Sequence, residues 1–281
     1  YQLTPIEPVD YLIIGHITRD LTPDGPLLGG TVTYSALMAQ ALGLRVGIVT
    51  SWGTELPLGP LQSIPIINNA SENSTTFENI STPAGRVQTV HNIAKNLDYS
   101  LVPDLWRNAP IVHLGPIVQE VDPSIVRYFS SSLIALTPQG WLRAWDNEGQ
   151  VYLTEWPEAA FVLEHARAAV VSLEDVEGDE FRLNEMATYC QILAVTEGAK
   201  GVRIYWNGDI RRFPAPEADV IDTTGAGDIF ATAFFVRLQK TRNPWEAARF
   251  GNLLASKSVS RIGLQAIPTP EEIQTCMIEV F

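Results

Sequence analysis

Residues 222–228 have the types and spacing of an anion-binding turn with a base built into it. The string is Asp222-Thr223-Thr224-Gly225-Ala226-Gly227-Asp228, and an apolar run over 229–235 follows. This pattern predicts a glycine turn that begins a helix, where unpaired N–H groups and the helix dipole favour an anion. A carboxylate beside that turn repels a bound phosphate. Asp228 is therefore best explained as a base that takes a proton from a hydroxyl attacking phosphorus.

This string resembles the DTxGAGD signature of the ribokinase (PfkB) family of carbohydrate kinases. The resemblance implies that the backbone at Gly225, Ala226 and Gly227 stabilises charge on the transferred phosphoryl group, and that Asp228 is the catalytic base. It also implies a nucleotide contact at Thr224. The simpler alternative is a helix start with small residues and an acidic partner for the dipole, which accounts for only one of these features.

Length and composition fit a single domain over 1–281, with 46% hydrophobic residues available for a core. No apolar run reaches the ~18 residues of a membrane span, and no leader pattern begins at Tyr1, so we expect a cytoplasmic protein without membrane contact. A net charge of −13 with 19 scattered Lys and Arg residues argues against nucleic acid as a partner. Cys190 and Cys276 lack metal-ligand spacing and are expected to be buried thiols.

Strand and helix signals alternate along the chain and predict an α/β fold with a doubly wound, mostly parallel sheet. Ligands are then expected at the C-terminal ends of the strands. The expected strands are 9–15, 45–50, 111–114, 133–136, 168–172 and 192–196. The expected helices are 31–42, 123–132, 179–190, 227–240, 244–260 and 270–278.

Two segments, 75–80 and 85–94, have the period-two pattern of a hairpin. The family resemblance implies a small β lid over the sugar, with its strands within about 16–30 and 73–100. Arg86 and Gln88 then face either the acceptor or solvent, and alternation alone leaves both orientations open. Exposed lid strands would also allow a homodimer to form through the lid.

The N-terminal region matches the family at the acceptor end. Asp20 follows the first strand and corresponds to a sugar-binding aspartate, whose oxygens suit the hydroxyls of a polyol. The alternative is a loop aspartate that caps a turn. Gly29 and Gly30 correspond to a glycine pair that lets the sugar approach the backbone. Tyr34 stands where most sugar kinases of the family carry asparagine, so it is expected to change which acceptor is bound.

The resemblance also assigns the donor end. Ser172 and Asp175 stand in place of an Asn-x-x-Glu motif that arranges Mg²⁺, although both are ordinary helix-capping residues too. Asp222 is the second expected metal-site residue, beside a segment at 256–263 that resembles a K⁺-binding loop. The remaining nucleotide contacts are expected at Thr196, Gly198, Gly201 and Asn252.

These features together predict a kinase that uses ATP and Mg²⁺ to phosphorylate a hydroxyl of a small sugar or polyol. The alternatives are a nucleoside kinase, in which Tyr34 stacks on a base, and a sensor that kept the fold without phosphoryl transfer. The sequence has no GxxxxGK[ST] string and no GxGxxG after the first strand. A P-loop NTPase and a Rossmann dehydrogenase are therefore excluded at the level of sequence.

Overall fold

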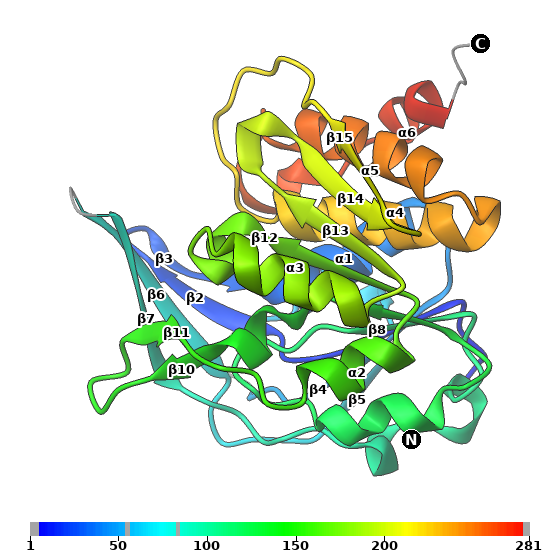
Figure 1. The fold of residues 1–281 in the computed structure, drawn as a ribbon. Coiled ribbons are helices and arrows are strands. Elements are labelled where there is room, and N and C mark those ends of the chain that lie inside the picture. Colours follow the sequence, from blue (N-terminus) through cyan, green and yellow to red (C-terminus); the bar gives the residue numbers. More distant parts are fainter. Residues whose placement is uncertain (1–5, 54–56, 83–84, 278–281) are drawn as a thin grey trace.

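A nine-stranded sheet in the order β15-β14-β13-β12-β9-β8-β1-β4-β5 forms the centre of the protein (Figure 1). The computed structural model describes residues 6–53, 57–82 and 85–277, and the side chains of 81–86 lie outside that description. Seven strands are parallel: β1 (Tyr11–Ile14), β4 (Val46–Thr50), β5 (Ile66–Asn68), β8 (Ile111–Leu114), β9 (Leu133–Leu136), β12 (Ala168–Ser172) and β13 (Ile192–Thr196). The last two, β14 (Val202–Trp206) and β15 (Asp209–Phe213), are antiparallel.

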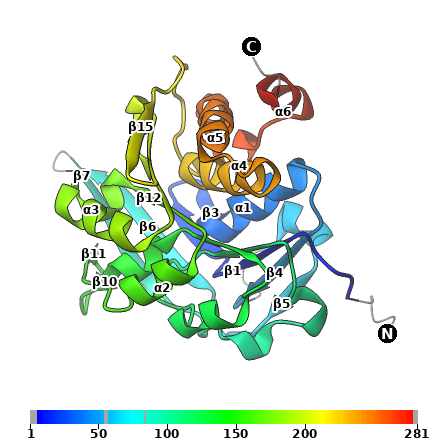
Figure 2. The same cartoon turned by 45° about the vertical axis from the view of Figure 1, so that its right-hand side comes forward.

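Helices cover both faces of this sheet (Figure 2). Successive residues of a strand point to opposite faces, so Tyr11 and Ile13 pack into one buried cluster while Leu12 and Ile14 pack into another. The first face carries α1 (Gly30–Ala41), α4 (Ala226–Thr241), α5 (Pro244–Ser258) and α6 (Pro270–Met277). The second carries α2 (Ala159–His165), α3 (Glu180–Tyr189) and 3₁₀ turns.

A smaller sheet projects from one side and forms the lid (Figure 1). Its order is β3-β2-β6-β7, made of β2 (Thr18–Thr22), β3 (Gly25–Gly29), β6 (Thr75–Thr82) and β7 (Gly85–Asn92). The hairpin of β10 (Arg143–Trp145) and β11 (Val151–Leu153) braces it, with Val90 N–H donating to the Gly149 carbonyl at 2.8 Å. The predicted fold class is therefore confirmed.

Several element boundaries differ from the sequence prediction. The segment expected to be helical at 123–132 forms only a 3₁₀ helix, Pro123–Tyr128. The last two sheet strands, the β10–β11 hairpin and α2 were not predicted, because they are short or lack a clean apolar period. Within the described part of the chain, no helix is long and apolar enough to cross a membrane.

Candidate functional site

A cavity of about 1010 Å³ lies at the C-terminal ends of the central strands, between the lid and the start of α4. Small-molecule sites usually measure about 300–1,000 Å³, so this cavity has room for two ligands side by side. Its position follows from topology, because the chain runs from β1 to β4 on one side and returns to β8 on the other. One end is lined by lid residues and the other by residues around β13 and α5.

The floor of the cavity is the turn that begins α4. Gly225 has φ +77°, and a Cβ atom built on it would lie 2.2 Å from the Tyr34 ring, so only glycine fits there. The N–H of Ala226 closes the turn by donating to the Thr223 carbonyl at 3.2 Å. A helix leaves its first N–H groups without intrahelical partners. The backbone donors available to an anion are therefore those of the next positions, including Gly227.

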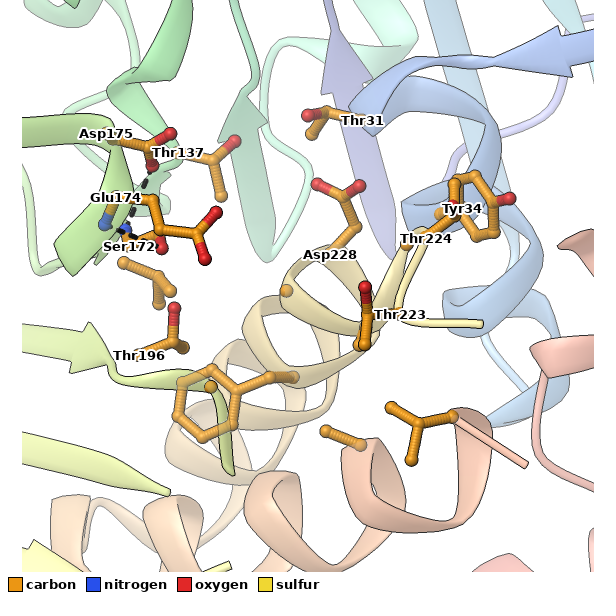
Figure 3. Close-up of a pocket in the computed structure, with 18 of the residues that line it drawn as sticks. Thr31, Tyr34, Thr137, Ser172, Glu174, Asp175, Thr196, Thr223, Thr224 and Asp228 are labelled. Atoms are coloured by element: carbon orange, nitrogen blue, oxygen red, sulfur yellow. Dashed lines mark hydrogen bonds between the residues drawn. The ribbon is translucent and has the colours of Figure 1, made fainter. Parts of the chain in front are cut away.

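Asp228 projects from the first turn of α4 into the cavity (Figure 3). Burial raises the pKa of this carboxyl to about 6, with a further increase from the nearby carboxylate of Asp175. A hydrogen bond with Thr31 and the positive charge of Arg143 act in the opposite direction. A carboxylate with a pKa close to neutrality is suited to accept a proton and release it again.

The lid end of the cavity contains the predicted acceptor residues. Asp20 lines the cavity and accepts a hydrogen bond from the Thr18 hydroxyl at 2.8 Å. A Cβ atom on Gly29 would lie 2.0 Å from an Asp20 carboxylate oxygen, so the glycine makes room for that side chain. Gln88 also lines the cavity and donates to Asn79 at 2.9 Å, which resolves its orientation. The Arg86 side chain lies outside the described part of the structure.

Tyr34 contributes an aromatic wall that is almost fully covered. Only 4% of it is exposed, and its ring packs over Gly225 and into a core cluster with Met38 and Phe250. Burial and the carboxylates of Asp222, Asp228 and Asp20 raise the pKa of its hydroxyl, so it stays protonated at neutral pH. The ring therefore supports the turn and leaves little face for stacking. Gly30 lies beside it in the lining.

The predicted metal motif forms a capping box at the end of β12. Asp175 accepts a hydrogen bond from the Ser172 N–H at 2.9 Å and one from Gln139 Nε2 at 2.8 Å. Glu174, which the sequence prediction passed over, extends its carboxylate into the cavity (Figure 3). No group of three or more His, Cys, Asp or Glu side chains arranged for a metal occurs among the described residues. Two carboxylates fit Mg²⁺, which keeps several of its waters.

The donor end of the cavity is lined mostly by small and uncharged residues, together with Glu217 and Asp219 of the loop before α4. Thr196, Gly198 and Gly201 lie in its wall at the hairpin between β13 and β14. Asn252 of α5 lies there too, and its amide donates to the Pro214 carbonyl at 2.8 Å, holding the loop before α4. Thr224 completes this side of the wall.

Asp222, like Gly29, is a predicted site residue that is not part of the described cavity lining. Its carboxylate accepts hydrogen bonds from the N–H groups of Thr224 and Gly263, both at 2.9 Å. It thus ties the turn before α4 to the loop after α5. The structure shows a positioning contact at this residue.

Several lining residues were missed by the sequence prediction. Four of them follow β8 or β9 or lie at the start of α1, where ligands of open α/β sheets bind, and the fifth begins β10. Their positions after the predicted strands could therefore have indicated most of these residues, although their residue types alone do not indicate a ligand site. They are Thr31, Ile117, Thr137, Gln139 and Arg143.

Part of this site lies in a segment that is similar to a known family. Residues 154–272, which contain the Ser172 motif, the β13–β14 turn and the start of α4, match the model of the pfkB family carbohydrate kinases. This segment of the chain is thus similar to the pfkB family carbohydrate kinases. The cytidine kinase of Thermococcus kodakarensis is 25% identical over 265 residues, covering 86% of this chain and 93% of that protein. The inositol 3-kinase of Zea mays is 28% identical, covering 53% of this chain and 39% of that protein.

Solved structures of kinases in the ribokinase family show the same fold. A pyrophosphate-dependent kinase in the ribokinase family, complexed with a pyrophosphate analog and myo-inositol, superposes with a TM-score of 0.79 at 18% identity. The match covers 94% of this chain and 99% of that one. The ribokinase of Arabidopsis thaliana complexed with ribose and ATP gives a TM-score of 0.70 at 18% identity, covering 96% and 98%.

Proposed function

We propose that this protein transfers the γ-phosphoryl group of ATP to a hydroxyl of a small, uncharged sugar or polyol. The observation that carries the proposal is the position of Asp228. Its carboxylate faces the cavity from the turn that also presents free backbone donors, between a lid end rich in polar side chains and a donor end. A base and an anion-binding turn at one point are what in-line phosphoryl transfer requires.

In the proposed reaction the acceptor lies against the lid end, held by Asp20, Asn79 and Gln88. Asp228 takes the proton of the attacking hydroxyl as its oxygen forms a bond to the γ-phosphorus, and the bond to the leaving ADP breaks. The N–H groups at the start of α4 stabilise the charge on the transferred group. Mg²⁺, held through water by Glu174 and Asp175, would neutralise the phosphate oxygens when bound.

The charges in the cavity favour a neutral acceptor. Asp20, Asp228, Glu174 and Asp175 all line it, whereas Arg143 supplies the one Lys or Arg among the described lining residues. A sugar that already carries a phosphate would bring a further negative charge beside these carboxylates. Hydroxyl groups, in contrast, can donate hydrogen bonds to each of them.

The donor end favours a nucleotide over pyrophosphate. The described residues that line this end include no Lys or Arg, so the phosphates of either donor would depend on backbone N–H groups and Mg²⁺. Thr196, Val202, Ala215, Ala255 and Val259 instead give it a partly apolar wall that suits the ribose and base of ATP.

A nucleoside is the second candidate acceptor, because the cytidine kinase relative aligns with most of this chain. Stacking of the base on Tyr34 does not support this alternative, because the Tyr34 ring is almost fully covered. Three expectations from the sequence stay predictions. They are the single domain over 1–281, the homodimer through the lid and a monovalent cation near the Asp222–Gly263 contact.

ADP release in the presence of Mg²⁺ tests the proposal. We expect turnover with ATP and one class of neutral acceptor from a panel of ribose, fructose, myo-inositol and cytidine, and no turnover when pyrophosphate replaces ATP. Fructose 6-phosphate is the matched charged control and should be a poor acceptor. Turnover with pyrophosphate would contradict the choice of donor, and preference for the phosphorylated sugar would contradict the charge argument. ATP binding without turnover across the panel would favour the sensor.

A further inference from the structure

A buried row of polar side chains runs beneath the cavity and ends at its wall. The Tyr11 hydroxyl lies 2.8 Å from His113 Nδ1, and His113 Nε2 lies 2.8 Å from the Thr137 hydroxyl. Tyr11 and His113 are fully buried, and Thr137 is 7% exposed where it lines the cavity. Neither Tyr11 nor His113 has a part in the reaction described above.

The direction of these hydrogen bonds follows from what Tyr11 can donate to. Tyr11 hydrogen-bonds both His113 Nδ1 and the Thr232 hydroxyl, and Thr232 has no other partner in the described part of the structure, so Thr232 donates its proton to the Tyr11 oxygen. A buried hydroxyl proton left unpaired is costly, so Tyr11 donates to Nδ1. Burial lowers the pKa of His113 to about 3, so the ring is neutral and carries its single proton on Nε2.

That tautomer fixes what Thr137 offers to the cavity. The Nε2 proton is donated to the Thr137 oxygen, so the Thr137 O–H is left to turn toward the cavity. The imidazole ring is held in place by edge contacts with the rings of Tyr11 and Phe235, whose centroids lie 5.9 and 5.2 Å away. The direction in which the Thr137 hydroxyl donates is therefore determined by packed groups on three separate elements.

The place of Thr137 identifies its target. A Cβ atom built on Gly115 would lie 2.9 Å from a Thr31 methyl carbon and 3.3 Å from the Thr137 hydroxyl oxygen, so these two threonines are neighbours. Thr31 hydrogen-bonds Asp228, and Figure 3 shows Thr31, Thr137 and Asp228 facing one space. A polyol there meets carboxylates that only accept hydrogen bonds. Its hydroxyl oxygens also need a donor.

We propose that Thr137 is an acceptor-binding residue, whose hydroxyl donates to the oxygen next to the one that Asp228 deprotonates, and that His113 and Tyr11 position it. This rests on the proposed function. The class of acceptor it selects is one with adjacent hydroxyl groups, because the donor of Thr137 and the acceptor of Asp228 serve neighbouring oxygens. A vicinal diol on a sugar, an inositol or the ribose of a nucleoside has this chemistry.

The tautomer is tested without any activity. In ¹⁵N-histidine NMR of the whole protein, with signals assigned through single His→Gln variants, the inference requires His113 to be neutral with its proton on Nε2. A proton on Nδ1 would mean that Thr137 donates to the ring, and it would overturn the inference.

Kinetics test the contact itself in the active enzyme. Thr137→Val, which keeps the shape and removes the hydroxyl, should raise the KM of the acceptor by about tenfold with the KM of ATP and kcat little changed. Thr137→Ser should recover most of that loss. An unchanged acceptor KM in Thr137→Val overturns the proposal. A wild-type enzyme that turns over no acceptor refutes the kinase function instead, and leaves the NMR result to decide the tautomer.

Discussion

Replacing Asp228 with asparagine should abolish turnover and yet stabilise the fold. The amide cannot take the proton of the attacking hydroxyl, and general-base catalysis is typically worth about 10²- to 10⁴-fold. We therefore expect kcat to fall within that range. ATP affinity should be retained or slightly improved, because a negative charge beside the phosphates is removed.

The stability effect follows from the raised pKa. Burial lifts the pKa of Asp228 from the reference value 3.8 to about 6, so the folded protein holds this proton more tightly than the unfolded chain does. The proton bound to Asp228 therefore stabilises the folded state. This contribution to the free energy of unfolding is complete below the pKa of the unfolded chain and is lost as the pH rises through 6. At 1.36 kcal/mol per unit, with a discount for solvent at the cavity, ionised Asp228 costs about 1–3 kcal/mol near pH 8.

Urea unfolding at pH 5 and pH 8 measures this cost. We expect the free energy of unfolding of Asp228→Asn to exceed that of the wild type by about 1–3 kcal/mol at pH 8 and by less at pH 5. Asp24→Asn, which removes an exposed carboxylate at the β2–β3 turn, is the charge-matched control and should change neither stability nor kcat. An Asp228→Asn protein that is less stable at pH 8, or that keeps near-normal turnover, would refute the burial and base arguments respectively.

Three further outcomes are expected. Gly225→Ala places a Cβ atom 2.2 Å from the Tyr34 ring at a positive φ, so urea unfolding should show a loss of about 1–3 kcal/mol and kcat should fall; full stability would contradict the close packing. Gly29→Ala pushes the Asp20 carboxylate aside and should raise the KM of the acceptor while leaving that of ATP unchanged in initial-rate assays; an effect on ATP alone would contradict this assignment. Removing Mg²⁺ with EDTA should stop turnover, and Glu174→Gln should raise the Mg²⁺ concentration for half-maximal rate about tenfold; an unchanged Mg²⁺ titration would exclude Glu174 from the metal site.

The sequence predicted the parts of the fold and site that local chemistry specifies. Central strands with continuous apolar runs, and the glycine turn that begins α4, were placed within one or two residues. The string at 222–228 combines special backbone geometry with a rare carboxylate, so it is informative without any knowledge of its neighbours. Asp20 and Gln88 line the cavity as expected, although their roles stay predictions.

The remainder depends on contacts between segments that lie far apart in the chain. Tyr34 was expected to change which acceptor is bound; it lines the cavity, and its ring also packs on Gly225, a contact that no local pattern predicts. Asp175 and Glu174 both line the cavity, and the capping box that holds Asp175 leaves Glu174 to extend into it, which the sequence prediction missed. In the sequence, nothing distinguishes His113 from the other residues of its apolar strand. Its role depends on the parallel pairing of β1 and β8, which brings Tyr11 beside it.

The central claim is that this cavity joins ATP to a neutral hydroxyl, and the most direct measurement is detection of the phosphate ester itself. The protein is incubated with ATP, Mg²⁺ and each neutral acceptor, and the products are analysed by ³¹P NMR and mass spectrometry. We predict ADP and a monophosphate ester of one acceptor class, formed by the wild type and lost in Asp228→Asn. ADP with inorganic phosphate and no ester, or an equal yield of ester from Asp228→Asn, would contradict the account.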